Sequence, residues 1–195
     1  MPCEFNRRRL EAEEIRDSLL AVSGNLDPAP GGEPPFTPEM SWRYTQHQPF
    51  IANEKDFATN KRSVYLMQQR IRRQPFLELF DGADPNAVTG VRPLTTTALQ
   101  ALYTMNDPFF HEQADALAVR VGLAYGSDAE RLAYAFRLLY GRTPSLEEVR
   151  DARQFLSAAR ASLSGTEVAE DRKNREALAS LMRVLLSSSE FLTLD

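Results

Sequence analysis

Three oxygen-bearing side chains, Asp81, Asp84 and Asn86, lie within the stretch LFDGADPNAVTG at residues 79–90. Such side chains at short spacing could bind a calcium ion, or two of them could share a proton as an acid/base pair. A calcium-binding EF-hand loop places oxygen ligands at positions 1, 3 and 5 and a glutamate at position 12. Counted from Asp81, the oxygen-bearing side chains occupy positions 1, 4 and 6, and Arg92 occupies position 12. The spacing therefore argues against an EF-hand site.

The acid/base interpretation stays open as an alternative, in which Asp81 and Asp84 would serve a hydrolase that acts on polysaccharide. We favour a turn, because DG and DPN are turn signals in which short polar side chains bind nearby backbone amides. Gly82 is expected to supply the positive φ of this turn. We also expect Asp81 to pair with an arginine, for which the candidates are Arg62, Arg70 and Arg92.

A second group of residues with possible chemistry is the basic tract at residues 61–73, which contains no acidic residue. Its cations are Lys61, Arg62, Arg70, Arg72 and Arg73. A cluster of this kind could bind a polyanion, a nucleic acid or a sulfated glycan, and Tyr65 could stack on a base. The chain as a whole carries a formal net charge of −4, however. We therefore expect the tract to pair with carboxylates of the chain, and nucleic acid is not the expected partner.

His111 lies at the start of a predicted helix, in NDPFFHEQA, with Asp115 one turn further on. These two side chains could present metal ligands on one helix face, but the zinc pattern with two histidines is missing. We expect a surface histidine next to the helix cap. No catalytic, cofactor-binding or metal-binding residue is assigned, and the candidate site is a polar junction made of Arg62, Arg70, Asp81, Asp84, Arg92, Asn106 and His111.

Composition is ordinary for a globular protein of 195 residues, with 43% hydrophobic and 26% charged residues. The single cysteine, Cys3, excludes an intramolecular disulfide and a C-x-x-C-H haem attachment, so no cofactor is expected in this chain. The first fifteen residues lack the apolar stretch of a secretory signal, and no run of apolar residues is long enough to span a membrane. A stand-alone protein of this sequence would therefore be cytoplasmic.

Hydrophobic periodicity predicts an all-α fold of six to seven helices, with at most one short strand or hairpin near residues 62–68. We expect one domain over residues 1–195. Its parts are an N-terminal helix, a Pro/Gly-rich linker region, a strand and junction, and a helical bundle, at residues 1–23, 24–60, 61–92 and 93–195 respectively.

Helix boundaries are marked by several local signals. Gly24 is placed to end the first helix, and Asp107 with Pro108 is placed to begin another. The pairs Ser127/Glu130 and Ser145/Glu148 are capping boxes. The predicted apolar stripes of two bundle helices are Phe110, Ala114, Leu117, Ala118 and Val121, and Leu146, Val149, Ala152, Phe155, Leu156, Ala159 and Leu163.

Six segments occur in an order that resembles a known family. They are RRRLEAEEIRDSLLAVSG, RSVYL, LELFDGADPN, TTTALQALYTMNDPFFHEQA, LLYGRTPSLEEV and LLSSSEFLTLD. Together they are similar to the C-terminal domain of unknown function of large planctomycete exported proteins, the planctomycete PSD domain family. The chain departs from the family pattern at Met67, where proline is usual, and at Ser189, where asparagine is usual.

This resemblance implies a module without an established activity in a longer, exported protein. Its companions there would be a cytochrome-c-like haem module, a second uncharacterised domain and sometimes a carbohydrate-binding-like insert. We expect the chain to be a fragment of such a protein, at the cell surface or in the periplasm, with haem only in the companion module. The leading hypothesis is a non-catalytic helical module that packs against those companion domains. The sequence does not indicate its oligomeric state.

Overall fold

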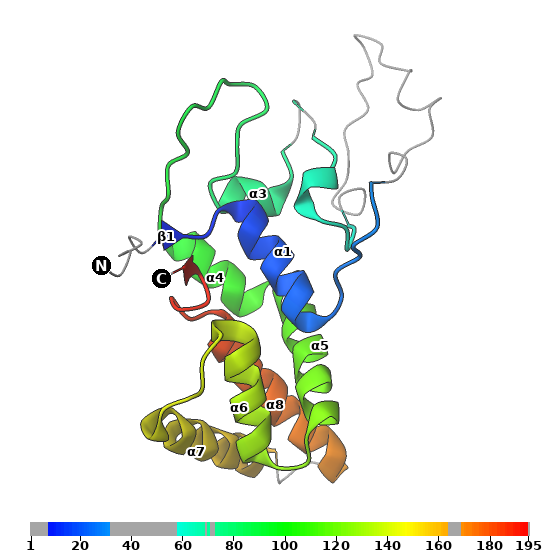
Figure 1. Ribbon diagram of the computed structural model, residues 1–195, viewed down its shortest axis with the longest axis vertical. Helices are drawn as coiled ribbons and strands as arrows, with labels where there is room; N and C mark the ends of the chain where they lie inside the picture. The colour runs from blue at the N-terminus through cyan, green and yellow to red at the C-terminus, as the bar shows by residue number, and fades with distance from the viewer. Residues whose placement is uncertain (1–7, 32–57, 69, 71–72, 164–168, 195) are drawn as a thin grey trace, which may run out of the picture. The chain divides into compact units, whose positions relative to one another are not determined.

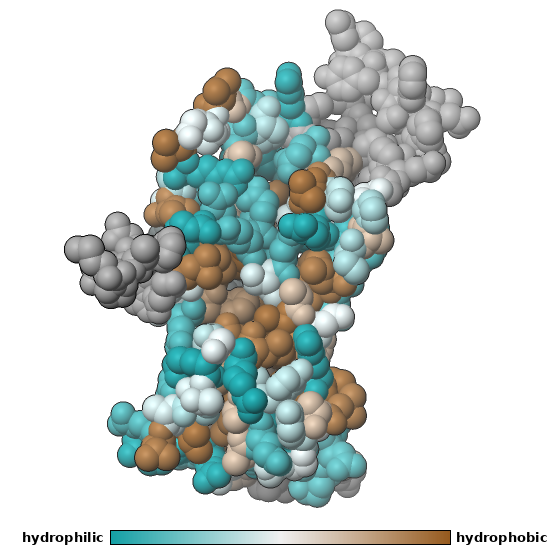
Figure 2. All heavy atoms as spheres, viewed as in Figure 1, coloured by the Kyte–Doolittle hydropathy of each residue, from teal (hydrophilic) through white to brown (hydrophobic). Residues whose placement is uncertain are grey.

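The computed structural model describes residues 8–31, 58–68, 70, 73–163 and 169–194. Within these ranges the chain forms seven α-helices and one antiparallel pair of short strands, which confirms the predicted mainly helical fold (Figure 1). No helix in the described ranges is both long enough and apolar enough to cross a membrane. Hydrophilic residues cover most of the face shown in Figure 2, and hydrophobic residues lie between them in separate patches.

The elements follow one another as β1 Arg8–Arg9, α1 Ala12–Ser23, the 3-10 helix η2 Ser63–Tyr65, α3 Pro75–Leu79, α4 Ala98–Asn106, α5 Pro108–Ala124, α6 Asp128–Tyr140, α7 Leu146–Ser162, α8 Glu170–Leu186 and β2 Thr193–Leu194. Two compact units divide the chain between them. Unit 1 consists of Met1–Leu10, Leu19–Asn25 and Ala101–Asp195, and unit 2 consists of Glu11–Ser18 and Leu26–Gln100. Most of the predicted linker region, residues 32–57, lies outside the described residues.

Helices α5 to α8 form the helical bundle of unit 1, as the sequence predicts. α8 packs against α5 and α7, and α6 also packs against these two helices. Five predicted core residues of α5 are all buried: Phe110, Ala114, Leu117, Ala118 and Val121. Apolar side chains of α8 meet them, and Met182 and Leu186 at its C-terminal end are completely buried. Burial of this apolar surface is the main term that stabilises the bundle.

Local capping chemistry sets the helix ends where the sequence indicates. Asp107 caps α5 by accepting a hydrogen bond from the amide of Phe109 at 2.8 Å, with Pro108 in the first helical position. Gly141 adopts a left-handed conformation with φ 70° and ends α6. Ser145 and Glu148 form both bonds of the predicted capping box of α7.

The predicted apolar stripe of α7 is wrong in part, because only Ala152 and Leu156 are buried on this helix. Leu146 is 93% exposed and Phe155 is 37% exposed. α7 packs against α6 and α8 along a narrow face. The apolar residues of its sequence occupy a wider arc of the helix than this face buries.

The N-terminal helix begins later than predicted. Arg8 and Arg9 are extended and pair with Leu194 and Thr193, so the chain is a strand where periodicity predicts helix. Hydrogen bonding between the amide of Leu10 and the carbonyl of Leu192 continues this pairing at 2.9 Å. These partners lie more than 180 residues away in the sequence, and local periodicity carries no information about them.

The end of α1 belongs to unit 1 and is held by α5. Gly24 has φ 86°, as predicted for a left-handed cap, and the amide of Asn25 donates to the carbonyl of Leu20 at 2.9 Å. Arg120 of α5 donates to the carbonyls of Ala21 and Val22. The last carbonyls of α1 are therefore satisfied by a cap and by a cation.

In unit 2, the predicted strand near residues 62–68 is wrong, since residues Ser63–Tyr65 form the 3-10 helix η2. Arg16 of α1, which is almost fully buried, donates to the carbonyl of Lys61 at 2.9 Å and also binds the carbonyl of Thr59. Asp17 accepts the amide of Ser63 at 2.7 Å. Side chains of α1 therefore bind the backbone groups that a neighbouring strand would need.

The turn that follows α3 also differs from the prediction. Asp81 adopts the left-handed conformation, with φ 65°, which we expected of Gly82. Aspartate is among the few residues other than glycine that adopt this conformation readily. Gly82 is required for space instead, because its amide donates to the carbonyl of Leu77 at 2.6 Å. A Cβ atom at position 82 would lie 2.7 Å from that same carbonyl oxygen.

We predict that Gly82→Ala lowers the free energy of unfolding by about 1 to 3 kcal/mol, because the added Cβ displaces a backbone carbonyl. Gly90→Ala is the matched control, since a Cβ atom at position 90 meets nothing within 4 Å. Thermal and urea denaturation of both variants would check this. A loss of the same size in both variants would contradict the steric explanation.

Candidate functional site

Asp81 joins the turn after α3 to the segment that precedes α4. Its carboxylate accepts the amide of Thr95 at 2.8 Å and the hydroxyl of Thr95 at 2.9 Å. Gln100 donates to the carbonyl of Leu79 at 2.9 Å and approaches Asp81 at 3.5 Å. Asp81 therefore binds Thr95 and Gln100 rather than one of the three arginines that we expected.

Asp84 forms the turn that the DPN signal predicts. Its carboxylate accepts the amide of Asn86 at 2.8 Å and pairs with Arg73. The hydrogen bond from the amide of Asn86 is the main cause that holds the pKa of Asp84 below its usual value, and the charge of Arg73 adds to this effect. Asn86 in turn donates to the carbonyl of Arg70 at 2.9 Å. These contacts tie Arg70 and Arg73 to the turn.

The remaining arginines of the predicted junction pair with α1 and with the residue before it. Arg92 lies 2.6 Å from a carboxylate oxygen of Glu13 and 3.2 Å from one of Glu11. Arg62 lies 3.7 Å from Asp17. Another cation of the basic tract, Lys61, pairs with Asp27 at 2.9 Å, whereas Arg72 lies outside the described residues.

Two further junction residues, Asn106 and His111, belong to unit 1. Asn106 donates to the carbonyl of Leu102 at 2.9 Å within α4. The Nε2 atom of His111 lies 2.8 Å from the carbonyl of Met105, and its Nδ1 atom lies 3.4 Å from Arg183. A carbonyl only accepts and a guanidinium only donates, so in these contacts Nε2 is the donor and Nδ1 is the acceptor.

Within the described residues, no hydrogen bond or ion pair joins two of the seven junction residues to each other. Each one binds partners of its own in a turn, at a helix end or beside α1. In the same ranges, His, Cys, Asp and Glu side chains do not gather in a group of three that could hold a metal ion. The contacts described for these residues are therefore contacts of the local fold.

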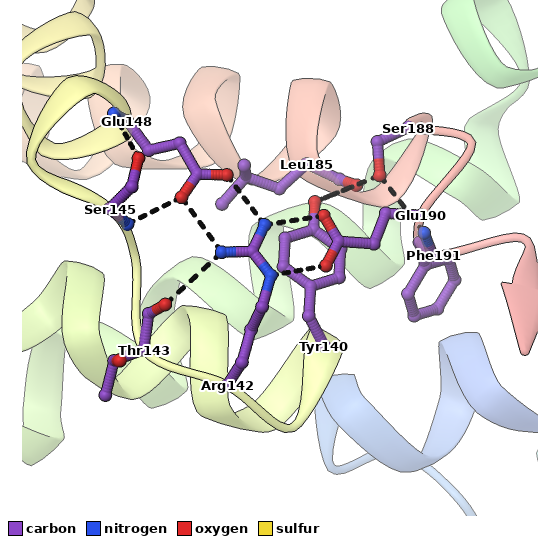
Figure 3. A network of polar contacts seen from close by, with 9 residues as sticks. All are labelled: Tyr140, Arg142, Thr143, Ser145, Glu148, Leu185, Ser188, Glu190 and Phe191. Carbon is purple, nitrogen blue, oxygen red and sulfur yellow. Dashed lines mark hydrogen bonds and ion pairs between the residues drawn. The ribbon is translucent and has the colours of Figure 1, made fainter. Parts of the chain in front are cut away.

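A different polar cluster, centred on Arg142, lies in the helical bundle of unit 1 (Figure 3). Arg142 follows α6, and its guanidinium binds both carboxylate oxygens of Glu190, at 2.6 and 2.7 Å. The same guanidinium binds both carboxylate oxygens of Glu148, at 2.9 and 2.6 Å. One cation therefore joins the start of α7 to the segment that follows α8. Bidentate contacts of this kind are stronger and more directional than single ion pairs.

Aromatic rings and hydroxyl groups support this cluster. The Arg142 guanidinium carbon lies 5.3 Å from the ring centre of Phe136 and 5.6 Å from that of Tyr140. The Tyr140 hydroxyl donates to the carbonyl of Leu185 at 2.8 Å and contacts the hydroxyl of Ser188 at 3.0 Å. Burial raises the pKa of Tyr140, so this phenol stays protonated and remains a donor at neutral pH.

The electrostatics of the cluster follow from these contacts. Hydrogen bonds from Arg142, together with those from the amide and hydroxyl of Ser145, lower the pKa of Glu148 to about 2. The two carboxylates raise the pKa of Arg142 above its usual value. Arg142 and Glu148 are therefore ionised over the whole physiological pH range.

An open groove of about 380 Å³ lies beside this cluster. We call it the α7–α8 groove. Its apolar lining consists of Phe136, Ala152, Phe155, Leu181, Val184 and Leu185, and its polar lining consists of Tyr140, Glu148, Asp151, Ser188 and Glu190. Phe155 and Val184 are 37% and 52% exposed, so two large apolar side chains of adjacent helices reach solvent here. Such a groove can bind an apolar side chain of a partner, and the carboxylates at its rim can bind a polar group next to that side chain.

Sequence reasoning found the capping box of Ser145 and Glu148, but it did not connect Arg142 with Glu190. The two residues are 48 positions apart, and neither segment alone predicts the pair. One signal was present: both lie in segments that carry the family resemblance, LLYGRTPSLEEV and LLSSSEFLTLD. The sequence does not indicate the groove, because periodicity predicts that Phe155 is buried in the core.

We predict that Glu148→Gln destabilises the chain near neutral pH and that this effect disappears in acid. The folded pKa of Glu148, about 2, lies below its ordinary value of 4.5. Its ionised form therefore stabilises the fold above about pH 4.5, and this contribution is lost as the pH falls toward 2. The difference in melting temperature between wild type and variant should shrink across this interval.

Glu147→Gln is the matched control, because Glu147 is 78% exposed and its one ion pair within the described part of the chain is with Arg150, at 3.5 Å. Glutamine at position 148 can still accept the amide of Ser145, so the helix cap is retained in the test variant. A difference in melting temperature that stays constant from pH 6 to about pH 2.5 would contradict the assigned electrostatics.

Comparison with known proteins places the chain in a family. The PSD1 family, described as "Protein of unknown function (DUF1553)", matches residues 2–156. The matched range covers most of the 195 residues and includes Arg142 and Glu148. Comparisons with curated proteins and with solved structures gave no match. The chain therefore belongs to the PSD1 family of proteins of unknown function.

Proposed function

We propose that this chain is a non-catalytic helical module that docks a segment of a companion domain in the α7–α8 groove. The observation that carries the proposal is the exposure of Phe155 and Val184 on two adjacent helices that line the same groove. Single exposed apolar residues are common on protein surfaces, but a groove that collects them is typical of a binding surface. A partner side chain in this groove would remove apolar area from water.

The site offers a rigid frame for such a partner. Met182 and Leu186 of α8, which lie on the same helix as Val184, are fully buried. Arg142 fixes Glu148 on α7 and Glu190 after α8 with four hydrogen bonds of 2.6 to 2.9 Å. A surface that is already ordered loses little conformational entropy when a partner binds, and this favours docking.

The contacts of Asp81 and Asp84 also support a non-catalytic role. A hydrolase would need these carboxylates free to meet a substrate. Asp81 is engaged by Thr95, and Asp84 is engaged by Asn86 and Arg73. By resemblance to the family, the companion would be another domain of an exported protein, such as a cytochrome-c-like module, and haem would belong to that module.

Titration of the chain with a neutral amphipathic peptide, whose helical apolar face is leucine and whose other positions are glutamine, would test this proposal. We expect shifts in the amide NMR spectrum to concentrate on the lining of the α7–α8 groove. Val184→Gln should weaken binding at least about fivefold, as expected when one apolar contact of about 1 kcal/mol is lost.

Val119→Gln is the matched control, because Val119 is also an exposed valine in a helix, α5, and does not line this groove. Binding that is lost equally in both variants, or shifts spread over the whole chain, would contradict the proposal. The absence of binding at millimolar peptide would contradict it as well.

A further inference from the structure

The rim of the α7–α8 groove carries more carboxylates than cations. Glu148 and Glu190 share the single guanidinium of Arg142. On α7 itself, Asp151 and Glu147 share the guanidinium of Arg150. Four carboxylates are thus paired with two cations, and three of the four, all except Glu147, line the groove itself. The rim is left with an excess of negative charge.

From this excess, resting on the proposed function, we infer that the occupant of the α7–α8 groove is a basic amphipathic segment. Its apolar side chain lies between Phe155 and Val184, and a lysine or arginine beside it meets the carboxylates of Glu190 and Asp151. The apolar lining supplies the affinity of such a contact, and the complementary charge selects the partner.

The carboxylates at the rim retain the capacity to bind a second cation. Each oxygen of Glu190 accepts one hydrogen bond, from Arg142, while a carboxylate oxygen can accept two. The side chain of Glu190 is 34% exposed, so the remaining acceptor positions of its carboxylate are accessible from solvent. Asp151 is 63% exposed, and among the described residues its carboxylate pairs with its neighbour Arg150 alone. An ammonium or guanidinium group of a partner can therefore bind here without displacing Arg142.

The same charges exclude other classes of partner. A nucleic acid or an anionic membrane surface would bring phosphates toward Glu148, Asp151 and Glu190, and like charges repel at this distance. Binding of an acidic peptide with the same apolar face would be opposed by the free energy needed to desolvate the carboxylates of the rim and those of the peptide. Basic segments are the only class for which the lining and the rim both favour binding.

Three fluorescein-labelled model peptides with one leucine face would test the inference, with lysine, glutamine or glutamate at the polar positions. Fluorescence anisotropy with the full chain at about 150 mM salt should rank their affinities as lysine, then glutamine, then glutamate. The lysine peptide should bind at least about fivefold more tightly than the glutamine peptide, and this advantage should decrease as salt is raised.

Two charge reversals on α7 separate the groove from the overall charge of the protein. Asp151→Lys changes the rim, whereas Glu147→Lys makes the same change of charge on a residue that does not line the groove. Both residues pair with Arg150, and both are exposed, so both variants should fold. We expect Asp151→Lys to weaken the lysine peptide about fivefold and Glu147→Lys to weaken it less than about twofold.

Equal affinities for the lysine and glutamate peptides would overturn the inference. Equal losses in Asp151→Lys and Glu147→Lys would overturn it too, because overall charge alone would then explain the preference. If the glutamine peptide binds and Val184→Gln weakens it while charge has no effect, the docking function stands and only the basic partner is wrong. If none of the peptides binds, both are wrong.

Discussion

The guanidinium of Arg142, shared between Glu148 and Glu190, is the polar contact that joins the α6–α7 connection, the start of α7 and the segment after α8. Arg142 lies in the short connection between α6 and α7, so its position is set by the left-handed cap at Gly141 on one side and by the capping box of α7 on the other. Glu148 closes that box and also binds Arg142. Local helix chemistry and long-range pairing therefore use the same carboxylate.

The other carboxylate carries this order to the end of the chain. Glu190 follows α8, two residues separate it from β2, and β2 pairs with β1. The ion pairs and the buried Phe191 thus direct the chain from the bundle to the strand pairing. The cluster also lines one side of the α7–α8 groove. The same carboxylates therefore hold these segments together and would select a partner. Four hydrogen bonds to one cation at this exposure are expected to contribute more than an isolated surface ion pair.

Local signals in the sequence predict much of this fold. Gly24, Pro108 and Ser145 mark helix ends correctly, because caps depend on residues within one turn of the boundary. The stripe of α5 is predicted correctly because that helix is covered along a whole face. The stripe of α7 is not, because the amount of a helical face that is buried depends on its neighbours. Phe155, which the sequence wrongly predicts to be a core residue, is a candidate binding residue.

Contacts between distant segments lie beyond such reasoning. Arg16 binds backbone groups at positions 59 and 61, Arg8 pairs with Leu194, and Arg142 binds Glu190. In each case the partner is chosen by the fold, and several carboxylates or carbonyls elsewhere in the chain offer the same chemistry. The prediction for the turn at Asp81 is wrong for a different reason. Either residue of an Asp-Gly pair can adopt a positive φ, and the close approach of Leu77 to Gly82 determines which of the two does so here.

The most direct test of the central role of Arg142 is a double-mutant cycle with Arg142→Gln and Glu190→Gln, measured by urea denaturation near neutral pH. A coupling free energy of about 1 kcal/mol or more is predicted, because Arg142→Gln leaves Glu190 without its cation and Glu190→Gln removes one of the two carboxylates that bind Arg142. Additivity of the two effects to within about 0.3 kcal/mol would contradict the account, since the shared guanidinium would then not hold the segment that follows α8.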